Sequence, residues 1–250
     1  MINYLINLDS EIEKRKDYDI PIYRIMPFKR IVEILKNGEV ILTQTKLWDD
    51  VYENFLLKSS KKFGDININL SEHIDTLYGQ CWSLNRETDA MWRIYSTDKL
   101  GVKIKTTIAK LTNSALHPDN QDKFHTFSIR VGKVKYEYLK NIKKKYSNFA
   151  VVDLISFFEP MLIESQFIKR KEFNHEREVR IIIRKTIPEN KTAPKIIKLK
   201  IDPNEFIENI IFDPRLDYSD YKIYKEILEK YGFKNNIYKS KLYNFEGLTL

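Results

Sequence analysis

The alternation of apolar and polar residues predicts strands along most of the chain. Residues 20–26 alternate as a half-buried strand does, with Pro21 tolerable at its beginning. The same pattern predicts strands over residues 39–43, 77–84, 101–105, 127–138, 178–184, 195–201 and 209–212. The run Ile181-Ile182-Ile183 is typical of a central strand, because both faces of such a strand are buried.

Apolar residues at helical spacing predict helices between these strands. Residues 28–36 place their apolar side chains on one face and are followed by Gly38, which is suited to a left-handed cap. Further helices are predicted over residues 87–95, 149–167 and 218–231, with Pro160 kinking or splitting the second of these three. Residues 48–62 have no clear period and are predicted to form a loop and a short helix. The mixture indicates an α+β fold.

The length of 250 residues favours one domain over residues 1–250, with residues 1–19 as a polar lead-in segment. Hydrophobic residues make up 42% and are interleaved with charges, as in a packed globule. No apolar run approaches the roughly 20 residues of a membrane-spanning helix, so no membrane partner is expected. The N-terminus does not resemble a secretory signal, and a lone Cys81 agrees with a reducing compartment. We therefore expect a cytoplasmic protein.

The chain is basic, with 43 Lys and Arg against 35 Asp and Glu and a net charge of +8. The excess gathers at Lys133, Lys135, Lys140, Lys143, Lys144 and Lys145, and again at Lys169, Arg170 and Lys171. Such a field attracts polyanions, of which nucleic acid is the commonest in a cytoplasm. Lysines on solvated helix faces explain the same composition, so charge alone identifies no function.

Several common nucleotide and metal motifs are missing. Seven glycines leave little room for a phosphate-cradling loop, and neither G-x-G-x-x-G nor a Walker motif occurs. The four histidines match no zinc-site spacing, and no Ser-His-Asp or Cys-His arrangement is visible. Metal-free chemistry is therefore expected, and any bound nucleotide must be held without a glycine loop.

The most informative segment is Glu176-Arg177-Glu178-Val179-Arg180, which leads into a buried strand. Residues two apart in a strand share a face, so Glu176, Glu178 and Arg180 are expected to converge. A carboxylate beside a cation stays ionised and can accept from a ribose hydroxyl or stabilise an oxocarbenium, while the second orients a nucleophile. The alternative is an exposed ladder of screened charges, which is more typical of edge strands.

Three further groups have a functional and a structural interpretation. Trp92 and Tyr95, three apart on a helix, could stack a nicotinamide or a base, or could be core residues. Arg24, beside Tyr23 on the first strand, could bind phosphate through its planar fork or lie on the rim. A last group, Asp49, Asp50 and Glu53, could hold a divalent cation or cap a short helix, and capping is favoured.

Together these segments resemble a widespread bacterial family known as a domain of unknown function. The resemblance runs from about Tyr23 to Tyr243 and rests on an ordered set of short motifs. In chain order they are Tyr-Arg, Asn-Gly after the first helix, Trp-Asp-Asp-x-Tyr-Glu, Cys-x-Ser, Met-Trp-x-x-Tyr with Gly-Val-x-Ile, Glu-x-Glu-x-Arg, and Ile-Ile-Phe-Asp-Pro.

That family in turn resembles a divergent branch of the ADP-ribosyltransferase fold, which implies an α+β domain with split antiparallel sheets and flanking helices. Its members carry a first-strand Arg or His, a middle Ser or Tyr, and a Glu that opens a later strand. The resemblance implies that Glu178 is catalytic, that Glu176 assists the acceptor, and that NAD is the co-substrate. The residues expected to bind NAD are Tyr23, Arg24, Ser83, Trp92, Tyr95 and Arg180. The usual Ser-Thr-Ser strand is replaced by Trp82-Ser83-Leu84, so the middle motif departs from the family pattern.

The resemblance extends to nucleic-acid-modifying toxins of phage-defence toxin and antitoxin systems. It implies an ADP-ribosyltransferase toxin that modifies nucleic acid, with RNA preferred over DNA or protein, and an antitoxin as partner. Two other classes stay open. One is a metal-dependent nuclease that uses Asp49, Asp50, Glu53 and the Glu176/Glu178 pair. The other is a non-enzymatic module that binds nucleic acid or a protein partner.

Overall fold

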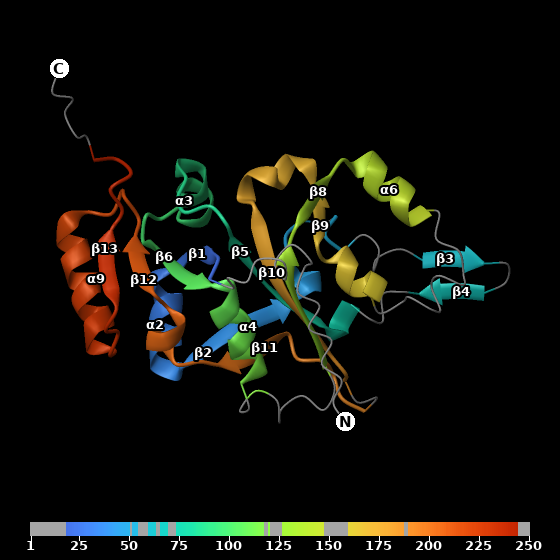
Figure 1. Cartoon of the computed structure of the whole chain (residues 1–250), viewed down its shortest axis with the longest axis horizontal. Coiled ribbons are helices and arrows are strands. Elements are labelled where there is room, and N and C mark those ends of the chain that lie inside the picture. The colour runs from blue at the N-terminus through green and yellow to red at the C-terminus, as the bar shows by residue number, and fades with distance from the viewer. Residues whose placement is uncertain are drawn as a thin grey trace, which may run out of the picture. The chain divides into compact units, whose positions relative to one another are not determined.

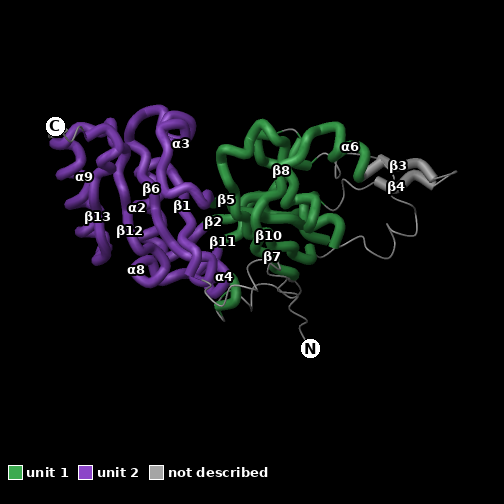
Figure 2. Tube along the Cα trace, turned by 45° about the horizontal axis from the view of Figure 1, so that its top comes forward, with its two compact units in different colours: residues 1–18, 41–82, 115–198 green, residues 19–40, 83–114, 199–250 purple. Residues whose placement is uncertain are grey.

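The computed structural model describes residues 19–50, 52–54, 60–63, 66–69, 74–117, 120, 127–147, 160–187 and 190–244. Their contacts divide the chain into two compact units (Figure 2). Unit 1 comprises residues 1–18, 41–82 and 115–198, and unit 2 comprises residues 19–40, 83–114 and 199–250. Each unit is assembled from separate stretches of sequence, and the single domain predicted from chain length stays a prediction.

Unit 2 contains a sheet whose centre is β1 (Pro21–Pro27) and β6 (Gly101–Thr107), paired antiparallel along their full length (Figure 1). Next to β6 lies β12 (Asn209–Phe212), also antiparallel, and β12 pairs parallel with β13 (Asn236–Lys239). On the other side of β1, Tyr23 pairs with Ser83 at the end of β5 (Leu77–Ser83). The predicted first strand is therefore a central one.

The helices of unit 2 are α2 (Phe28–Asn37), α3 (Asp89–Tyr95), α4 (Ile108–Leu116), α8 (Pro203–Phe206) and α9 (Tyr218–Lys230). The first of these ends at Gly38, whose φ of 61° gives the left-handed cap predicted from the sequence. Aromatic rings join helix to helix and helix to sheet: the Phe28 ring lies 4.6 Å from that of Tyr224 and 6.0 Å from that of Phe212.

The sheet of unit 1 has β10 (Glu178–Lys185) as its most buried strand, as its apolar run predicts. Antiparallel to β10 runs β7 (Phe127–Lys133), and β10 also pairs with β5, which pairs in turn with β2 (Glu39–Gln44). The remaining elements are two short ladders, β3 (Ser60–Phe63) with β4 (Ile66–Asn69) and β8 (Lys135–Glu137) with β9 (Ile168–Arg170), and β11 (Ile196–Lys200). Helix α6 (Leu139–Ser147) and two 3-10 helices, η1 (Thr45–Leu47) and η3 (Lys171–Glu176), complete the described elements.

The core of unit 1 packs residues 160–167 against the central sheet. Leu77, Leu162, Phe167 and Ile182 belong to one buried cluster, and the Trp48 ring packs against it. A side chain at Gly79 would meet this ring, because an added Cβ would lie 2.6 Å from Trp48 Cζ2. Glycine in mid-strand here permits the close approach of the ring that also contacts the candidate site.

The α+β prediction is confirmed, and most predicted strands lie within a residue or two of those observed. Three expectations differ. Residues 60–63 form a strand where the end of a short helix was predicted. Residues 127–138 form two strands separated at Val134, and the Val134 N–H donates to the carbonyl of Glu178. The predicted 149–167 helix lies partly outside the described residues, which are helical from Pro160 to Ser165. None of the described helices is long and apolar enough to span a membrane.

Candidate functional site

Glu178 is fixed at the start of β10 by its own backbone. Its N–H donates to the Tyr136 hydroxyl at 2.8 Å, and its carbonyl accepts from the Val134 N–H at 2.9 Å. The preceding residue, Arg177, has a φ of 44°, in the left-handed region that few non-glycine residues adopt. Glu176 belongs to η3, so the expectation that it shares a strand face with Glu178 was wrong. The turn at Arg177 nonetheless leaves the two carboxylates close together.

Arg180 has no exposed surface and is held by hydrogen bonds in three directions. Its Nε donates to Glu178 Oε2, its Nη1 to the Gln166 carbonyl, and its Nη2 to Glu53 Oε1, each at 2.6 Å. The guanidinium also lies 4.6 Å from the centre of the Trp48 ring. A buried cation requires such partners, because an unpaired charge is very costly away from water. The alternative of an exposed charge ladder is therefore wrong.

Lys169 is the second cation of the cluster and contacts three carboxylates at once. Its Nζ lies 2.5 Å from Glu176 Oε2, 2.8 Å from Glu178 Oε1 and 3.2 Å from Glu53 Oε1. All four side chains are at least nine-tenths buried. The lysine was grouped with the surface charges of the basic sequence runs, and the structure places it inside instead.

The two glutamates of the pair differ in their affinity for protons. Burial alone would raise the pKa of Glu178, but the Arg180 guanidinium and the Lys169 ammonium outweigh it and hold this pKa at about 2. Burial and the neighbouring Glu178 raise the pKa of Glu176, although Lys169 opposes the shift. Environments that push two adjacent carboxyl pKa values apart are typical of acid and base pairs. Glu178 is thus the weaker base of the pair, and Glu176 is the stronger one.

The acidic motif before this cluster divides between two roles. Asp50 accepts from the Tyr52 N–H at 3.1 Å within a turn, and also pairs with Arg170 at 3.0 Å. Glu53 does not cap a helix, because its side chain is buried against Arg180 and Lys169. Within the described residues no group of acidic, His or Cys side chains is arranged to hold a metal ion. The position among the three converging glutamates is filled by the Lys169 ammonium.

A pocket in unit 2 contains three of the residues predicted to bind NAD, namely Tyr23, Ser83 and Trp92. The complete lining is Tyr23, Ile25, Ser83, Asn85, Arg86, Glu87, Thr88, Met91, Trp92 and Lys103. Tyr23 and Ser83 meet because β1 and β5 are paired at these residues. Trp92 is fully buried and donates from Nε1 to Glu87 Oε1 at 2.7 Å. It is therefore both a core residue and part of the pocket wall.

Three other predicted residues, Arg24, Tyr95 and the fully buried Arg180, do not line this pocket. Arg24 follows Tyr23 and precedes Ile25, so strand alternation points its side chain to the opposite face of β1. Tyr95 is 43% exposed, in contrast to the fully buried Trp92 on the same helix. The expectation that Trp92 and Tyr95 present one common aromatic face is therefore not met, and the roles of Arg24 and Tyr95 stay predictions.

Lys103 in this pocket carries no signal in the sequence, where it is one of many lysines. Its side chain is 3% exposed, its Nζ donates to the Arg86 carbonyl at 2.7 Å, and it lies 3.3 Å from Glu87 Oε1. The ammonium also faces the rings of Trp92 and Tyr23, at 5.3 and 5.8 Å from their centres. Burial lowers the pKa of Lys103, and Glu87 opposes that shift.

Helix α3, which carries Trp92, is anchored at both ends by residues near the C-terminus. Ser240 Oγ donates to Glu87 Oε1 at 2.5 Å, just before the helix begins. At its other end, Arg215 Nη2 donates to the carbonyls of Trp92 and Ser96, at 3.1 and 2.7 Å. Asp213, which is fully buried, orients Arg215. The Ile-Ile-Phe-Asp-Pro motif therefore supports the pocket, although its sequence does not say so.

Comparison with known proteins gives two kinds of similarity. Residues 91–181 match a family model described as a protein of unknown function (DUF2971). The segment contains Trp92, Tyr95 and the Glu-x-Glu-x-Arg motif. No curated protein gives a match.

Among solved structures, the chain is similar to Thermus sp. 2.9 DarT in complex with NAD⁺, with 11% identity, 89% of this chain and 96% of that chain covered, and a TM-score of 0.40. The same protein in complex with ADP-ribosylated single-stranded DNA gives 10% identity, coverages of 90% and 96%, and a TM-score of 0.39. Its complex with carba-NAD⁺ gives 9% identity, with 89% of this chain and 96% of that chain covered, and a TM-score of 0.37.

Proposed function

We propose that this chain is an NAD-dependent ADP-ribosyltransferase that modifies nucleic acid in the cytoplasm. The observation that carries the proposal is the buried carboxylate pair at the start of β10, in which Glu178 is ionised and Glu176 has the higher affinity for a proton. An ionised carboxylate is what the departure of nicotinamide requires, since positive charge develops on the ribose. The proposed fold is the ADP-ribosyltransferase-like one that the sequence motifs imply.

Each residue of the pair has a distinct proposed role. Glu178 accepts from a ribose hydroxyl and stabilises the oxocarbenium. Its oxygens already accept from Arg180 and Lys169, but each carboxylate oxygen has two lone pairs and keeps capacity for a further donor. Glu176, with its raised pKa, takes the proton from the acceptor group as that group attacks. The proposed NAD-binding residues are Tyr23, Arg24, Ser83, Trp92, Tyr95 and Arg180.

The proposed acceptor is nucleic acid, because the surface of the chain is basic and polyanions are drawn to such a field. RNA is the first choice, with DNA and protein as alternatives. The resemblance of the sequence motifs to phage-defence toxins supports a toxin role with an antitoxin partner. A metal-dependent nuclease is not favoured, since Lys169 already fills the position among Glu53, Glu176 and Glu178.

The test is incubation of the purified protein with NAD labelled in its ADP-ribose part and with separate pools of RNA, DNA and protein. Glu178→Gln keeps the size of the side chain but not its charge, so both NAD cleavage and transfer should fall by about 10²-fold or more. Glu176→Gln should lose transfer and retain slow NAD hydrolysis. The matched control is Glu226→Gln on the exposed face of α9. Parental transfer by a folded Glu178→Gln variant would refute the proposal, and chelator-sensitive cleavage without NAD would indicate a nuclease.

A further inference from the structure

The strongest local concentration of positive charge in unit 1 lies between β7 and the end of α6. Residues 127–147 contain seven Lys or Arg residues and a single acidic residue, Glu137. In the structure the only buried residue among 139–145 is Ile142, and the lysines of α6 at positions 140, 143, 144 and 145 are exposed. The helix is therefore attached through an apolar residue and presents its cations to solvent.

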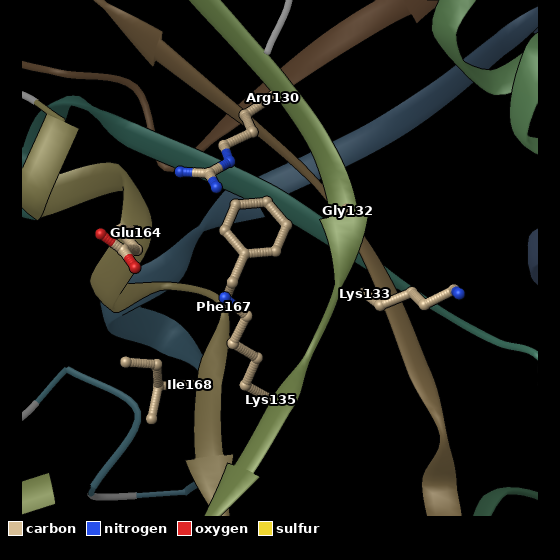
Figure 3. Close-up of a pocket in the computed structure, with 7 residues that line it drawn as sticks. All are labelled: Arg130, Gly132, Lys133, Lys135, Glu164, Phe167 and Ile168. Atoms are coloured by element: carbon tan, nitrogen blue, oxygen red, sulfur yellow. The ribbon is translucent and has the colours of Figure 1, made fainter. Parts of the chain in front are cut away.

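A pocket lies beside this helix, lined by Arg130, Gly132, Lys133, Lys135, Glu164, Phe167 and Ile168 (Figure 3). Two of the lining residues, Lys135 of β8 and Ile168 of β9, are opposite each other in the parallel pairing of these strands. Figure 3 shows Arg130 above the Phe167 ring and Lys133 extending away from both. The cations of the lining are Arg130, Lys133 and Lys135.

Arg130 lies against an aromatic ring of the same pocket. The centre of its guanidinium lies 5.2 Å from the centre of the Phe167 ring, which is buried and supports the guanidinium plane. No hydrogen bond or ion pair joins this guanidinium to another residue in the part of the chain that the structure describes. Glu164, the acidic residue of the lining, is paired with Lys145 at 3.5 Å. A guanidinium whose donors bind none of the described residues is suited to a phosphate.

We propose that this surface, comprising Arg130, Lys135, Lys140 and Lys143, binds consecutive phosphates of a nucleic-acid strand. Arg130 receives one phosphate in the pocket, and Lys135 with the α6 lysines neutralises its neighbours along the strand. The inference rests on the proposed function for the identity of the polyanion, which is the acceptor. The two basic runs of the sequence differ in exposure. Lys169 of the second run is buried in the glutamate cluster, whereas the lysines at positions 135, 140, 143, 144 and 145 of the first run are exposed and available to a polyanion.

The experiment measures binding without NAD, so that no chemistry is required. Fluorescence anisotropy is recorded over a series of salt concentrations with labelled single-stranded RNA, single-stranded DNA of the same sequence, and the duplex. The variants are Arg130→Gln and the exposed pair Lys135→Gln and Lys140→Gln, and the control is Lys230→Gln, an exposed lysine of unit 2. For each phosphate contact removed, the slope of log K against log salt should become shallower by roughly 0.7 on a single strand.

A variant slope and affinity equal to those of the Lys230→Gln control would overturn the proposal, for Arg130 and for the lysines separately. The lysine variants guard against a purely structural effect of Arg130, because their side chains are exposed and their loss does not open the core. NAD hydrolysis in the same variants should stay at the parental rate. If binding is lost as expected but Glu178→Gln leaves NAD turnover unchanged, the nucleic-acid surface stands and the proposed transferase function fails.

Discussion

Arg180 and Glu178 lie two residues apart on β10, and the Arg180 guanidinium donates to the Glu178 carboxylate at 2.6 Å. The Arg180 side chain has no exposed surface. The same guanidinium reaches Gln166 and Glu53, so it joins three segments that are far apart in the sequence. The Glu-x-Glu-x-Arg motif is thus a structural anchor as well as the proposed source of the catalytic carboxylate.

Replacement of Arg180 by Lys should destabilise the protein, because one ammonium cannot reproduce three hydrogen bonds of a planar fork. We expect the free energy of unfolding to fall by about 1–3 kcal/mol, the usual effect of leaving buried polar partners unsatisfied. Urea unfolding followed by circular dichroism measures this change. Arg184→Lys on the same strand, where the side chain is half-buried, is the control and should change stability less. Equal stability of the two variants would contradict the anchoring role.

The depressed pKa of Glu178 predicts a specific dependence of stability on pH. The folded protein holds this carboxyl at about 2 against an ordinary value of 4.5, so it binds fewer protons than the unfolded chain between these values. The free energy of unfolding contributed by Glu178 is therefore present above pH 4.5 and is lost as pH falls toward 2. Glu176 acts in the opposite direction because its pKa is raised. When the pH of Glu178→Gln is lowered from 4.5 toward 2, its free energy of unfolding should fall less steeply than that of the parent protein. An equal dependence of the free energy of unfolding on pH in the two proteins would contradict the lowered pKa of Glu178.

Arg24 gives a test of cofactor binding that is independent of the glutamates. If it grips a pyrophosphate through two parallel hydrogen bonds, Arg24→Lys keeps the charge but loses the two-point contact. Calorimetric titration with NAD should then show a clear loss of affinity, while the thermal unfolding midpoint barely moves. Arg30→Lys, an exposed helix residue paired with Glu33, is the control and should bind as the parent does. The same NAD affinity in both variants would make Arg24 a rim residue.

Much of the fold follows from local pattern, and most of the site does not. The sequence of β1 alternates between apolar and polar residues, as in a strand with one buried face, and this alternation predicts it. The sequence of β10 is a continuous apolar run, as in a strand with both faces buried, and this run predicts it. The short β13 and the lysine-rich α6 were not predicted. The alternation of apolar and polar residues in β13 is too short to predict a strand. In α6 there are few apolar residues beyond Ile142, so the sequence shows no clear helical spacing of apolar positions.

The candidate site shows the same division. The sequence pairs Glu178 with Arg180 because they are two residues apart on a strand, and this pairing is observed. It names Glu53 only as a possible metal ligand or cap and does not reveal Lys169, because the ion pairs of Lys169 with Glu53 and Glu178 depend on chain segments that tertiary packing brings together. Buried lysines look like surface lysines in a basic sequence. Their partners can be recognised only when the packing of β9 and β10 is known.

Lys169 should be the most sensitive position of the cluster, since its ammonium separates the carboxylates of Glu53, Glu176 and Glu178. Lys169→Met leaves Glu53 and Glu178 with their ion pairs to Arg180 and removes the ion pair of Glu176 with the ammonium. Removal of one partner from a buried ion network typically costs about 3–5 kcal/mol, and that loss is expected at neutral pH. The loss should shrink as pH falls, because a carboxyl that takes up a proton no longer needs the ammonium.

A double-mutant cycle with Glu176→Gln separates this electrostatic effect from loss of packing around the lysine stem. If repulsion among carboxylates causes the instability, removing one of them should restore part of it, with a coupling of about 0.5–3 kcal/mol between the two changes. Lys171→Met, two residues on and exposed, controls for the change in net charge. Urea unfolding of the four proteins of the cycle measures the coupling. Strict additivity would mean that Lys169 does not stabilise the cluster through its ion pair with Glu176.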